Sequence, residues 1–247
     1  MLVPEKYGGL GLSLIDFALV MEEIGWGDAG VASTIGVTSQ AALSLANVAT
    51  EGQKEKWLRA LCEDESGEFL IAGCNTESAG GSEVYCPLPD PNLGIKTRAI
   101  RDGEFWVING LKLWTTSGGV AKLYIVHART DLEGPNATSC TPFLVPAGTP
   151  GLKFGRCENK LGRRCQRNQE IFLEDVRVPH ENILGGRLGG SYKWAWEPTP
   201  AGGRVVAHFY MGASTIGLAR AAYEEALNYA SEHKTWGKWT APFRLDR

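Results

Sequence analysis

The sequence predicts an α+β multidomain protein. We expect a helical N-terminal domain over residues 1–69, a central β domain over residues 70–186 and the start of a C-terminal helical bundle over residues 187–247. The first part carries apolar side chains at helical spacing, the middle is a series of short strand-like segments between turns, and the end is one long helical pattern. The number and spacing of the short strands predict a sandwich or barrel for the central domain.

Composition narrows the class of protein. The chain has 247 residues, of which 43% are hydrophobic, so it can bury a substantial core. Its formal net charge of −3 gives no electrostatic reason to expect a nucleic-acid partner. No apolar run approaches the ~20 residues that cross a bilayer, so we expect no membrane span. The first residues have neither an apolar nor an Arg-rich leader, so we also expect no targeting segment.

The cysteines point to a reducing compartment. There are six, without the CxxC spacing of a zinc site or the pattern of a disulfide framework. We therefore expect free thiols, no metal site, and a location in a bacterial cytoplasm or the mitochondrial matrix.

Three helices are expected in the N-terminal domain, after a Gly-rich loop over residues 4–11. The first covers residues 13–26, with Ser13 as its N-cap. The second runs from about residue 33 to 49, and the third covers residues 51–61, with its apolar side chains on one side and its charges on the other.

Turn dipeptides organise the β domain. Asp102-Gly103 and Asn109-Gly110 both tolerate the positive φ that tight antiparallel turns require. They divide the chain into three predicted strands of one meander, and similar patterns elsewhere bring the total to about seven. The segments with a strand pattern, from which this approximate total is taken, are residues 69–74, 94–101, 104–108, 111–116, 121–129, 141–146, 152–161 and 169–178.

Two stretches could form a ligand site. In the strand 111–116 alternation places Lys112, Trp114 and Thr116 on one face, where an indole and a hydroxyl could wall a flat ligand. An ordinary half-buried strand explains the same pattern. The loop 75–83 offers backbone N–H groups to an anion or a polar ring edge, although it has neither a Walker A sequence nor a helix after it. On its own the loop is equally compatible with an ordinary turn.

Other segments are expected to be structural. The three prolines of residues 85–93 predict a surface loop. His127, inside an apolar strand, is expected to be a core histidine rather than a ligand.

From Gly203 onward one long helix is predicted, with an apolar stripe that includes Val206, Tyr210, Ile216 and Leu227. Because nothing follows that could pack against this helix, we expect the C-terminal domain to be cut off and the stripe to drive association.

Taken together, these stretches resemble the acyl-CoA dehydrogenase family across nearly the whole chain. The motifs occur in the family's order and at the family's spacing. They are Pro4-Glu-Lys-Tyr-Gly-Gly9, Gly52-Gln-Lys-Glu-Lys56, Cys74-Asn-Thr-Glu77 with Gly81-Ser82, Ile108-Asn-Gly-Leu-Lys-Leu-Trp-Thr-Thr116, Thr149-Pro-Gly151, Phe172-Leu-Glu-Asp-Val-Arg-Val-Pro179, Glu181-Asn182, Leu184-Gly185, Tyr229-Ala230 and Lys234-Thr-Trp-Gly237.

The resemblance implies an FAD-dependent oxidoreductase of fatty acid metabolism that converts an acyl-CoA thioester into a 2-enoyl-CoA. The family holds FAD between the β domain and C-terminal helices, forms homo-oligomers (dimers or tetramers), and passes electrons to an acceptor such as electron-transfer flavoprotein. A general base removes the α proton while a hydride leaves the β carbon for flavin N5, which requires preorganised donors away from water.

Family motifs also imply roles for individual residues. Cys74, Asn75 and Thr76 fall in a cofactor-binding stretch, with Thr76 at the pyrimidine edge of the flavin. Ser82 matches a serine near the cofactor's phosphates and the thioester end of the substrate. A second cofactor-binding stretch is Trp114, Thr115 and Thr116, in which the indole lies against the isoalloxazine and Thr116 meets N5.

Further matches lie near the end of the chain. Arg204 matches an arginine close to the acyl-CoA site. His233 stands where an arginine normally meets the FAD pyrophosphate, and Thr235 and Trp236 match positions that contact a neighbouring subunit's FAD.

The sequence also departs from the family pattern. Asn75 replaces an apolar residue, Glu83 replaces an Asp, and Gln166-Arg-Asn168 replaces a stretch that usually contains Ser and Thr. Residues 85–93 resemble an insertion shared by some branches. The family's first helix or two is also expected to be missing.

The catalytic base is expected beyond Arg247. In most members it is a glutamate of the C-terminal helical region, and in a minority it precedes the helix-opening arginine, where this chain has Gly203. Glu197 is nearby in sequence, but we do not expect it to substitute. Residues 1–247 alone are therefore expected to be inactive.

Two alternatives remain open. One is a non-catalytic subunit that completes a flavin site with a partner. The other is an acyl-CoA oxidase or flavin-dependent monooxygenase on the same fold.

Overall fold

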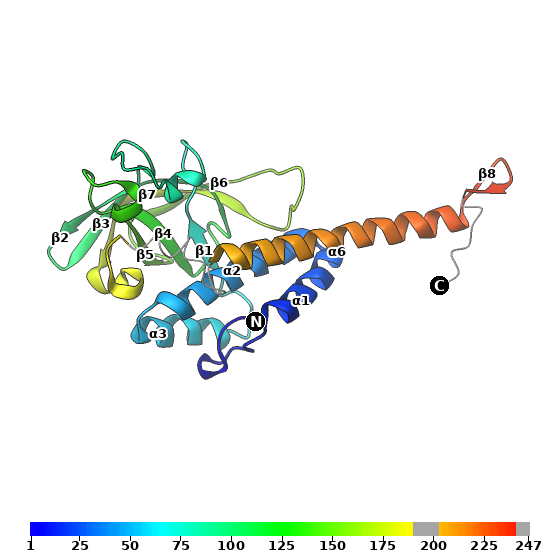
Figure 1. The fold of residues 1–247 in the computed structure, drawn as a ribbon, viewed down its shortest axis with the longest axis horizontal. Coiled ribbons are helices and arrows are strands. Elements are labelled where there is room, and N and C mark those ends of the chain that lie inside the picture. The colour runs from blue at the N-terminus through cyan, green and yellow to red at the C-terminus, as the bar shows by residue number, and fades with distance from the viewer. Residues whose placement is uncertain (190–202, 241–247) are drawn as a thin grey trace.

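The computed structural model describes residues 1–189 and 203–240, with only the backbone for residues 203–205. Helices form one side of the molecule and a β-sheet forms the other (Figure 1). After the short 3-10 helix η1 (Glu5–Tyr7), the helical side contains α1 (Leu14–Gly27), α2 (Ala29–Val48) and α3 (Glu51–Cys62). The α+β fold class predicted from the sequence is confirmed.

Capping residues set the helix starts. The Ser13 hydroxyl accepts a hydrogen bond from Asp16 N, as predicted for the start of α1. In α3, Thr50 and Gln53 form a capping box. The prediction for α2 was wrong by four residues, because Asp28 caps Gly30 N and Val31 N at 2.7 and 2.8 Å and so starts the helix earlier.

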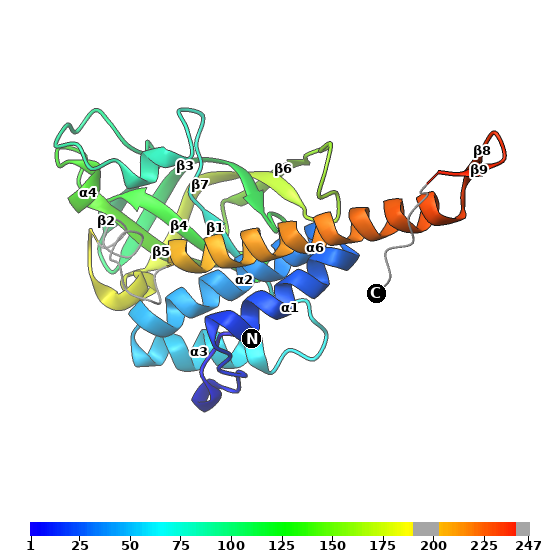
Figure 2. The same cartoon turned by 45° about the vertical axis from the view of Figure 1, so that its right-hand side comes forward.

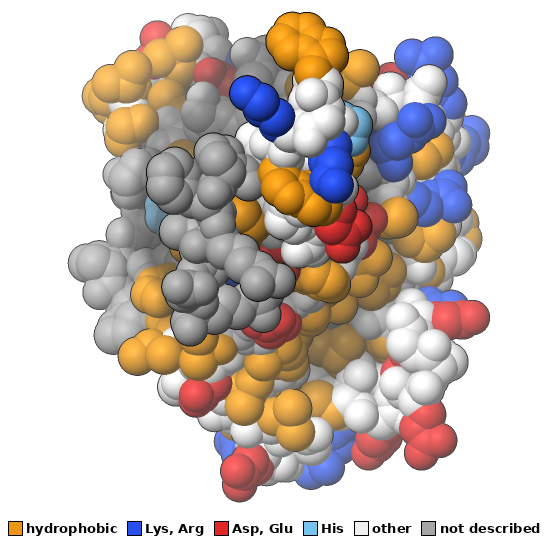
Figure 3. All heavy atoms as spheres, turned by 90° about the vertical axis from the view of Figure 1, so that its right-hand side faces the viewer, with side chains coloured by type: hydrophobic (Ala, Val, Ile, Leu, Met, Phe, Trp, Pro, Cys, Tyr) orange, Lys and Arg blue, Asp and Glu red, His pale blue; other side chains and the backbone are white. Residues whose placement is uncertain are grey.

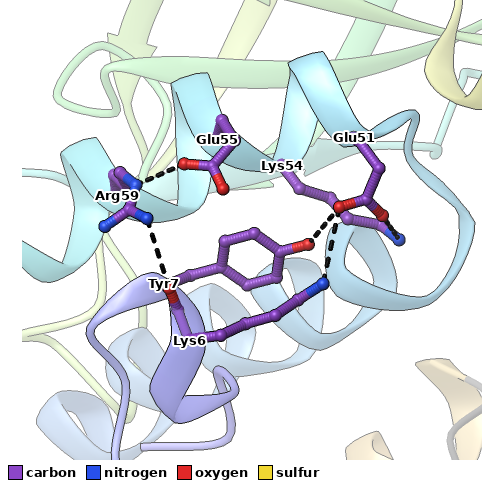
Figure 4. Close-up of polar contacts among 6 residues, drawn as sticks. All are labelled: Lys6, Tyr7, Glu51, Lys54, Glu55 and Arg59. Carbon is purple, nitrogen blue, oxygen red and sulfur yellow. Dashed lines mark hydrogen bonds and ion pairs between the residues drawn. The ribbon is translucent and has the colours of Figure 1, made fainter.

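Polar contacts hold the N-terminal loop against α3 (Figure 4). The buried Tyr7 donates its hydroxyl to Glu51 at 2.9 Å, and Arg59 donates to Lys6 O at 3.3 Å. Hydrogen bonds from Lys54 and Tyr7 lower the pKa of the exposed Glu51 carboxyl to about 2. These contacts fix the loop that precedes α1 and therefore the position of the first helix.

Seven strands form one sheet in the order β1-β4-β2-β3-β7-β6, with β5 paired to β4. Tyr124 of β4 and Phe154 of β6 contact each other with ring centroids 5.5 Å apart, although β6 is at the far end of the strand order. The sheet is therefore curled. Its strands are β1 (Ile71–Cys74), β2 (Arg98–Asp102), β3 (Phe105–Thr116), β4 (Leu123–Arg129), β5 (Cys140–Pro146), β6 (Leu152–Cys157) and β7 (Asn168–Pro179).

The predicted turn at Asn109-Gly110 is wrong. β3 runs through it as one strand, with an irregular register against β7 between Ile108 and Gly110. The Asn109 side chain exchanges two hydrogen bonds with Asp175 of β7, and a Cβ at Gly110 would lie 2.5 Å from Thr97 Oγ1. The two residues thus serve a bulge and a close strand contact, which have the same local signature as a turn.

The helices and sheet share a core. Ala41, Ala42 and Leu45 of α2 pack with Ile71 of β1 and Leu123 of β4. This packing places one face of α2 against β1 and β4, and Figure 2 shows α2 lying along the sheet.

α6 (Gly203–Glu232) lies along α1 and α2 in its first half and extends away in its second half (Figures 1 and 2). Its packing partners are helices that precede it in the chain. Val206 and Tyr210 are buried with Phe17 of α1, and a Cβ at Gly217 would lie 2.0 Å from Glu22 O. Arg220 also donates to Glu22 at 2.8 Å.

The end of the predicted helix is a hairpin. α6 ends at Glu232, and β8 (Lys234–Thr235) pairs with β9 (Lys238–Trp239) around Trp236 and Gly237, both at positive φ. Figure 3 views the end at which α6 projects and shows hydrophobic side chains open among charged ones. Ile216 is 59% exposed, so the predicted apolar stripe is only partly free.

Within the described ranges, no helix is long and apolar enough to cross a membrane. The same residues contain no group of three or more His, Cys, Asp or Glu side chains placed to hold a metal ion.

Candidate functional site

A cavity of about 220 Å³ lies between α2 and the adjoining ends of β1 and β3. α2 contributes small and polar side chains, including Gln40, Ala41 and Ser44. The sheet side includes five residues that the sequence analysis named, which are Asn75, Thr76, Trp114, Thr115 and Thr116. Two predicted stretches that are far apart in sequence therefore meet at one site.

A backbone irregularity at the end of β3 shapes the cavity wall. Trp114 has φ of 53°, and the pairing with β7 shifts register between Lys112 and Thr115. The indole remains 56% exposed and lines the cavity together with Thr116. Strict alternation would have put Lys112 beside them, but the bulge leaves Lys112 fully buried away from the cavity.

Lys112 supports the site from behind. Its ammonium donates to Glu77 at 2.7 Å, and this carboxylate also accepts from Thr97 N, Thr97 Oγ1 and Lys96 N. Burial tends to raise the pKa of Glu77, but Lys112 and these hydrogen bonds outweigh it and lower the pKa. The ion pair anchors the loop after β1 to β3.

The loop presents two polar side chains to the cavity. Thr76 O accepts from Leu113 N at 2.9 Å, which joins the loop to β3. Asn75 Nδ2 donates to the Tyr85 hydroxyl at 3.5 Å, while the buried Asn75 Oδ1 has no donor among the described residues. An unmet buried acceptor in a cavity fits a ligand that brings an N–H or O–H group.

Side chains from the loop before β7 and from the first residue of β7 surround Thr116. Its hydroxyl oxygen accepts from Gln166 Nε2 at 2.9 Å and from Asn168 Nδ2 at 3.3 Å. Asn168 Nδ2 also donates to Trp114 O at 2.7 Å, and Asn168 Oδ1 accepts from Lys160 Nζ at 2.6 Å. Burial lowers the pKa of Lys160.

Two uncharged side chains, those of Cys74 and His127, lie in the sheet core near the Lys112–Glu77 ion pair. Burial raises the pKa of the Cys74 thiol to about 12. Burial and the charge of Lys112 lower the pKa of His127 to about 3. Both side chains are buried in the sheet, so the expectation of a core histidine agrees with the structure.

The structure separates other predicted site residues from the cavity. The Cys74 side chain packs in the hydrophobic core, so only its backbone can serve a cofactor. Ser82 begins the 3-10 helix η2 (Ser82–Tyr85), is exposed and does not line the cavity. The side chain of Arg204 and all of Glu197 lie outside the described residues.

The predicted site residues near the end of the chain lie far from the cavity. His233 stacks on Tyr229 with ring centroids 4.7 Å apart, beyond the half of α6 that packs on α1 and α2. Thr235 and Trp236 belong to the exposed hairpin, with Trp236 98% exposed. Within the described part of this chain, none of the three lines the cavity, and the hairpin lies at the end of α6 that points away from the sheet (Figure 1).

Sequence reasoning missed several residues. Gln40 and Tyr85 line the cavity, although Tyr85 was assigned to a surface loop. Gln166 and Asn168 were noted only as departures from a family pattern. That departure was itself the available signal, because replacing the small hydroxyl side chains beside a site by longer amides changes the hydrogen bonds made there.

Comparisons with known proteins agree with this arrangement. The profile "Acyl-CoA dehydrogenase, N-terminal domain" matches residues 1–65, and "Acyl-CoA dehydrogenase, middle domain" matches residues 72–176. Cyclohex-1-ene-1-carbonyl-CoA dehydrogenase of Syntrophus aciditrophicus is 34% identical over 237 residues, which are 96% of this chain and 53% of that protein. The chain thus spans about half the length of this curated relative.

Solved structures are similar as well. Butyryl-CoA dehydrogenase from Megasphaera elsdenii superposes with a TM-score of 0.83 at 34% identity, over 98% of this chain and 60% of that one. An acyl-CoA dehydrogenase complexed with FAD from Bacillus anthracis gives 0.79 at 30% identity, over 98% and 38%.

The fold and these matches define a class of FAD-dependent oxidoreductases. The chain belongs to the acyl-CoA dehydrogenase family. Its resemblance to that family, inferred from sequence motifs, is confirmed.

Proposed function

We propose that the cavity binds the isoalloxazine ring of FAD and that the protein dehydrogenates an acyl-CoA thioester to a 2-enoyl-CoA. The convergence of Thr76, Trp114 and Thr116 on one cavity is the observation that carries this proposal. When bound, FAD supplies the acceptor for the hydride that leaves the substrate.

The residues present fit such a ring. The unmet Asn75 Oδ1 offers an acceptor, and the Thr76 and Thr116 hydroxyls offer donors at the same cavity. The indole of Trp114 gives a flat apolar surface suited to a fused aromatic system. Donors on both sides of a half-enclosed cavity favour a ring with polar edges over a purely apolar ligand.

Each residue has a proposed task. Trp114 covers a ring face and excludes water from it. Thr116 holds a proton toward the reacting end of the ring, where hydrogen bonding stabilises charge as it develops. Thr76 orients the ring from the opposite strand end, and the buried Lys112–Glu77 pair keeps both strand ends in register.

Substrate-side residues are also proposed. Arg204 would lie near the acyl-CoA and Ser82 near its thioester end. His233, Thr235 and Trp236 would approach the FAD of a neighbouring copy in a homo-oligomer, with electron-transfer flavoprotein as the electron acceptor. The protein would act in a bacterial cytoplasm or the mitochondrial matrix.

We propose that residues 1–247 alone lack the general base. Loss of such a base typically lowers a rate by about 10²–10⁴-fold. The test is anaerobic: FAD and a panel of acyl-CoAs are added to this polypeptide, and to the longest form that the gene encodes, while flavin bleaching is followed. We expect bleaching with a stoichiometric enoyl-CoA only in the longer form.

Two results would contradict the proposal. Failure of the longest form to bind FAD would reject the cofactor site. Rapid bleaching by residues 1–247 would reject the missing base and direct attention to Glu197. A reduced flavin that reacts quickly with oxygen would instead favour an oxidase.

A further inference from the structure

The hydroxyl of Thr116 is surrounded by donors. A threonine oxygen accepts two hydrogen bonds and donates one. Gln166 Nε2 and Asn168 Nδ2 both donate to Thr116 Oγ1, at 2.9 and 3.3 Å. With its lone pairs engaged on the side of the β6–β7 loop, Thr116 has its proton left for an acceptor on the cavity side.

The orientation of Asn168 is fixed by partners of unambiguous polarity. Lys160 Nζ can only donate, and it contacts Asn168 Oδ1 at 2.6 Å. Trp114 O can only accept, and it contacts Asn168 Nδ2 at 2.7 Å. The amide therefore cannot be turned over without losing both contacts, so its nitrogen must face Thr116.

The same amide supports the bulge. Trp114 adopts a positive φ that non-glycine residues rarely take, and such a conformation persists only when its surroundings hold it. The hydrogen bond from Asn168 to the Trp114 carbonyl is such a restraint. One side chain thus contacts both residues that face the proposed ring.

We propose that Asn168 and Gln166 are positioning residues. They direct the Thr116 proton into the cavity, and Asn168, oriented by Lys160, also holds Trp114 in its bulged conformation. This inference rests on the proposed FAD site, and it gives a role to the Gln166-Arg-Asn168 stretch, which departs from the family pattern.

The direct test replaces a donor by an acceptor of the same size. In Gln166→Glu the new carboxylate should draw the Thr116 proton away from the cavity. In the longest form that the gene encodes, we expect FAD to bind about fivefold more weakly, as in Thr116→Val. The ¹⁵N signal of FAD labelled at N5 should shift equally in the two variants.

A double variant separates this coupling from general damage. Gln166→Glu with Thr116→Val should bind FAD no more weakly than Thr116→Val alone, because the second change removes an interaction already lost. The control Asn159→Asp adds the same charge to the same loop at an exposed position, and its N5 signal should match the wild type. Additive losses, or an unshifted N5 signal in Gln166→Glu, would overturn the proposal.

A measurement without ligand distinguishes the positioning role of Gln166 and Asn168 from the proposed FAD site. By NMR, the side-chain amide protons of Gln166 and Asn168 should exchange with water more slowly than those of the exposed Asn159, and Thr116→Val should accelerate exchange at Gln166. If the wild type fails to bind FAD while these amides are protected, the FAD site is wrong and the orientation of Thr116 stands. Unprotected amides would reject the positioning role whatever FAD does.

Discussion

Two regions carry the residues assigned to the cofactor, and they differ in how this chain supports them. At the cavity, Trp114 and Thr116 are held by the end of β3, the loop before β7 and the buried Lys112–Glu77 pair. At the far end of α6, Trp236 is 98% exposed on a two-stranded hairpin. The first region is organised by long-range contacts within the chain, whereas the second has mainly local ones.

The difference shows which half of a shared site one chain can preorganise. A ring wall needs side chains that do not move, and buried polar contacts provide that rigidity. Residues that meet a neighbouring copy need only a stable local scaffold until that copy binds. The cavity should therefore be sensitive to single substitutions that the hairpin tolerates.

The largest effect is expected from Lys112→Met. It leaves the Glu77 carboxylate buried without its cation, which typically costs about 3–5 kcal/mol in the free energy of unfolding. Lys234→Met is the matched control, because Lys234 is exposed above the Trp239 ring and should change stability by less than about 0.5 kcal/mol. Urea denaturation measures both, and equal losses would show that the two regions are not distinguished by burial.

The second largest effect is expected from acid, which should lower the free energy of unfolding through the buried His127. The pKa of His127 is lowered to about 3 in the folded state, below the value of about 6.5 in an unfolded chain. The unfolded state therefore gains a proton first as pH falls, so this contribution to stability is complete above about pH 6.5 and is lost toward pH 3. Between pH 7 and pH 5 the loss amounts to about 2 kcal/mol.

The checking variant is His127→Leu, which should remove that acid dependence from the free energy of unfolding. His233→Leu, in the exposed region, should retain it. If His127→Leu and the wild type lose stability in parallel between pH 7 and pH 5, the acid sensitivity arises elsewhere.

A smaller effect is expected from Trp114→Phe. A smaller ring covers less of a bound isoalloxazine, so FAD affinity should fall by about 1 kcal/mol while thermal stability is retained. Trp236→Phe should weaken FAD binding only in samples that are oligomeric by sedimentation. A sharp fall in melting temperature with unchanged FAD affinity would make Trp114 a core residue instead.

Local sequence signals predicted much of the fold. Ser13 and the amphipathic pattern of residues 51–61 gave two helices close to their observed bounds, because capping and burial are encoded within a few residues. Asn109-Gly110 misled because a bulge and a turn require the same backbone freedom. The packing of α6 on α1 depends on Gly217 meeting Glu22 O, a contact between distant segments that periodicity does not reveal.

The site was predictable in part, where its residues are contiguous in the sequence. The motif around Trp114 identified the cavity wall, since its residues are contiguous. The burial of Lys112 away from the cavity was not predictable from strand alternation. It follows from the bulge at Trp114, whose positive φ depends on support from Asn168 and on the register with β7. Tyr85 was missed because its neighbours are prolines and polar residues typical of a surface loop.

Amide hydrogen exchange with and without FAD reports on the cavity and on the C-terminal hairpin in one experiment. If the cavity binds the isoalloxazine ring, FAD should slow exchange in residues 73–77 and 111–117, where β1 and β3 end at the cavity. Unchanged exchange in both stretches, with protection confined to other parts of the chain such as residues 229–240, would contradict it.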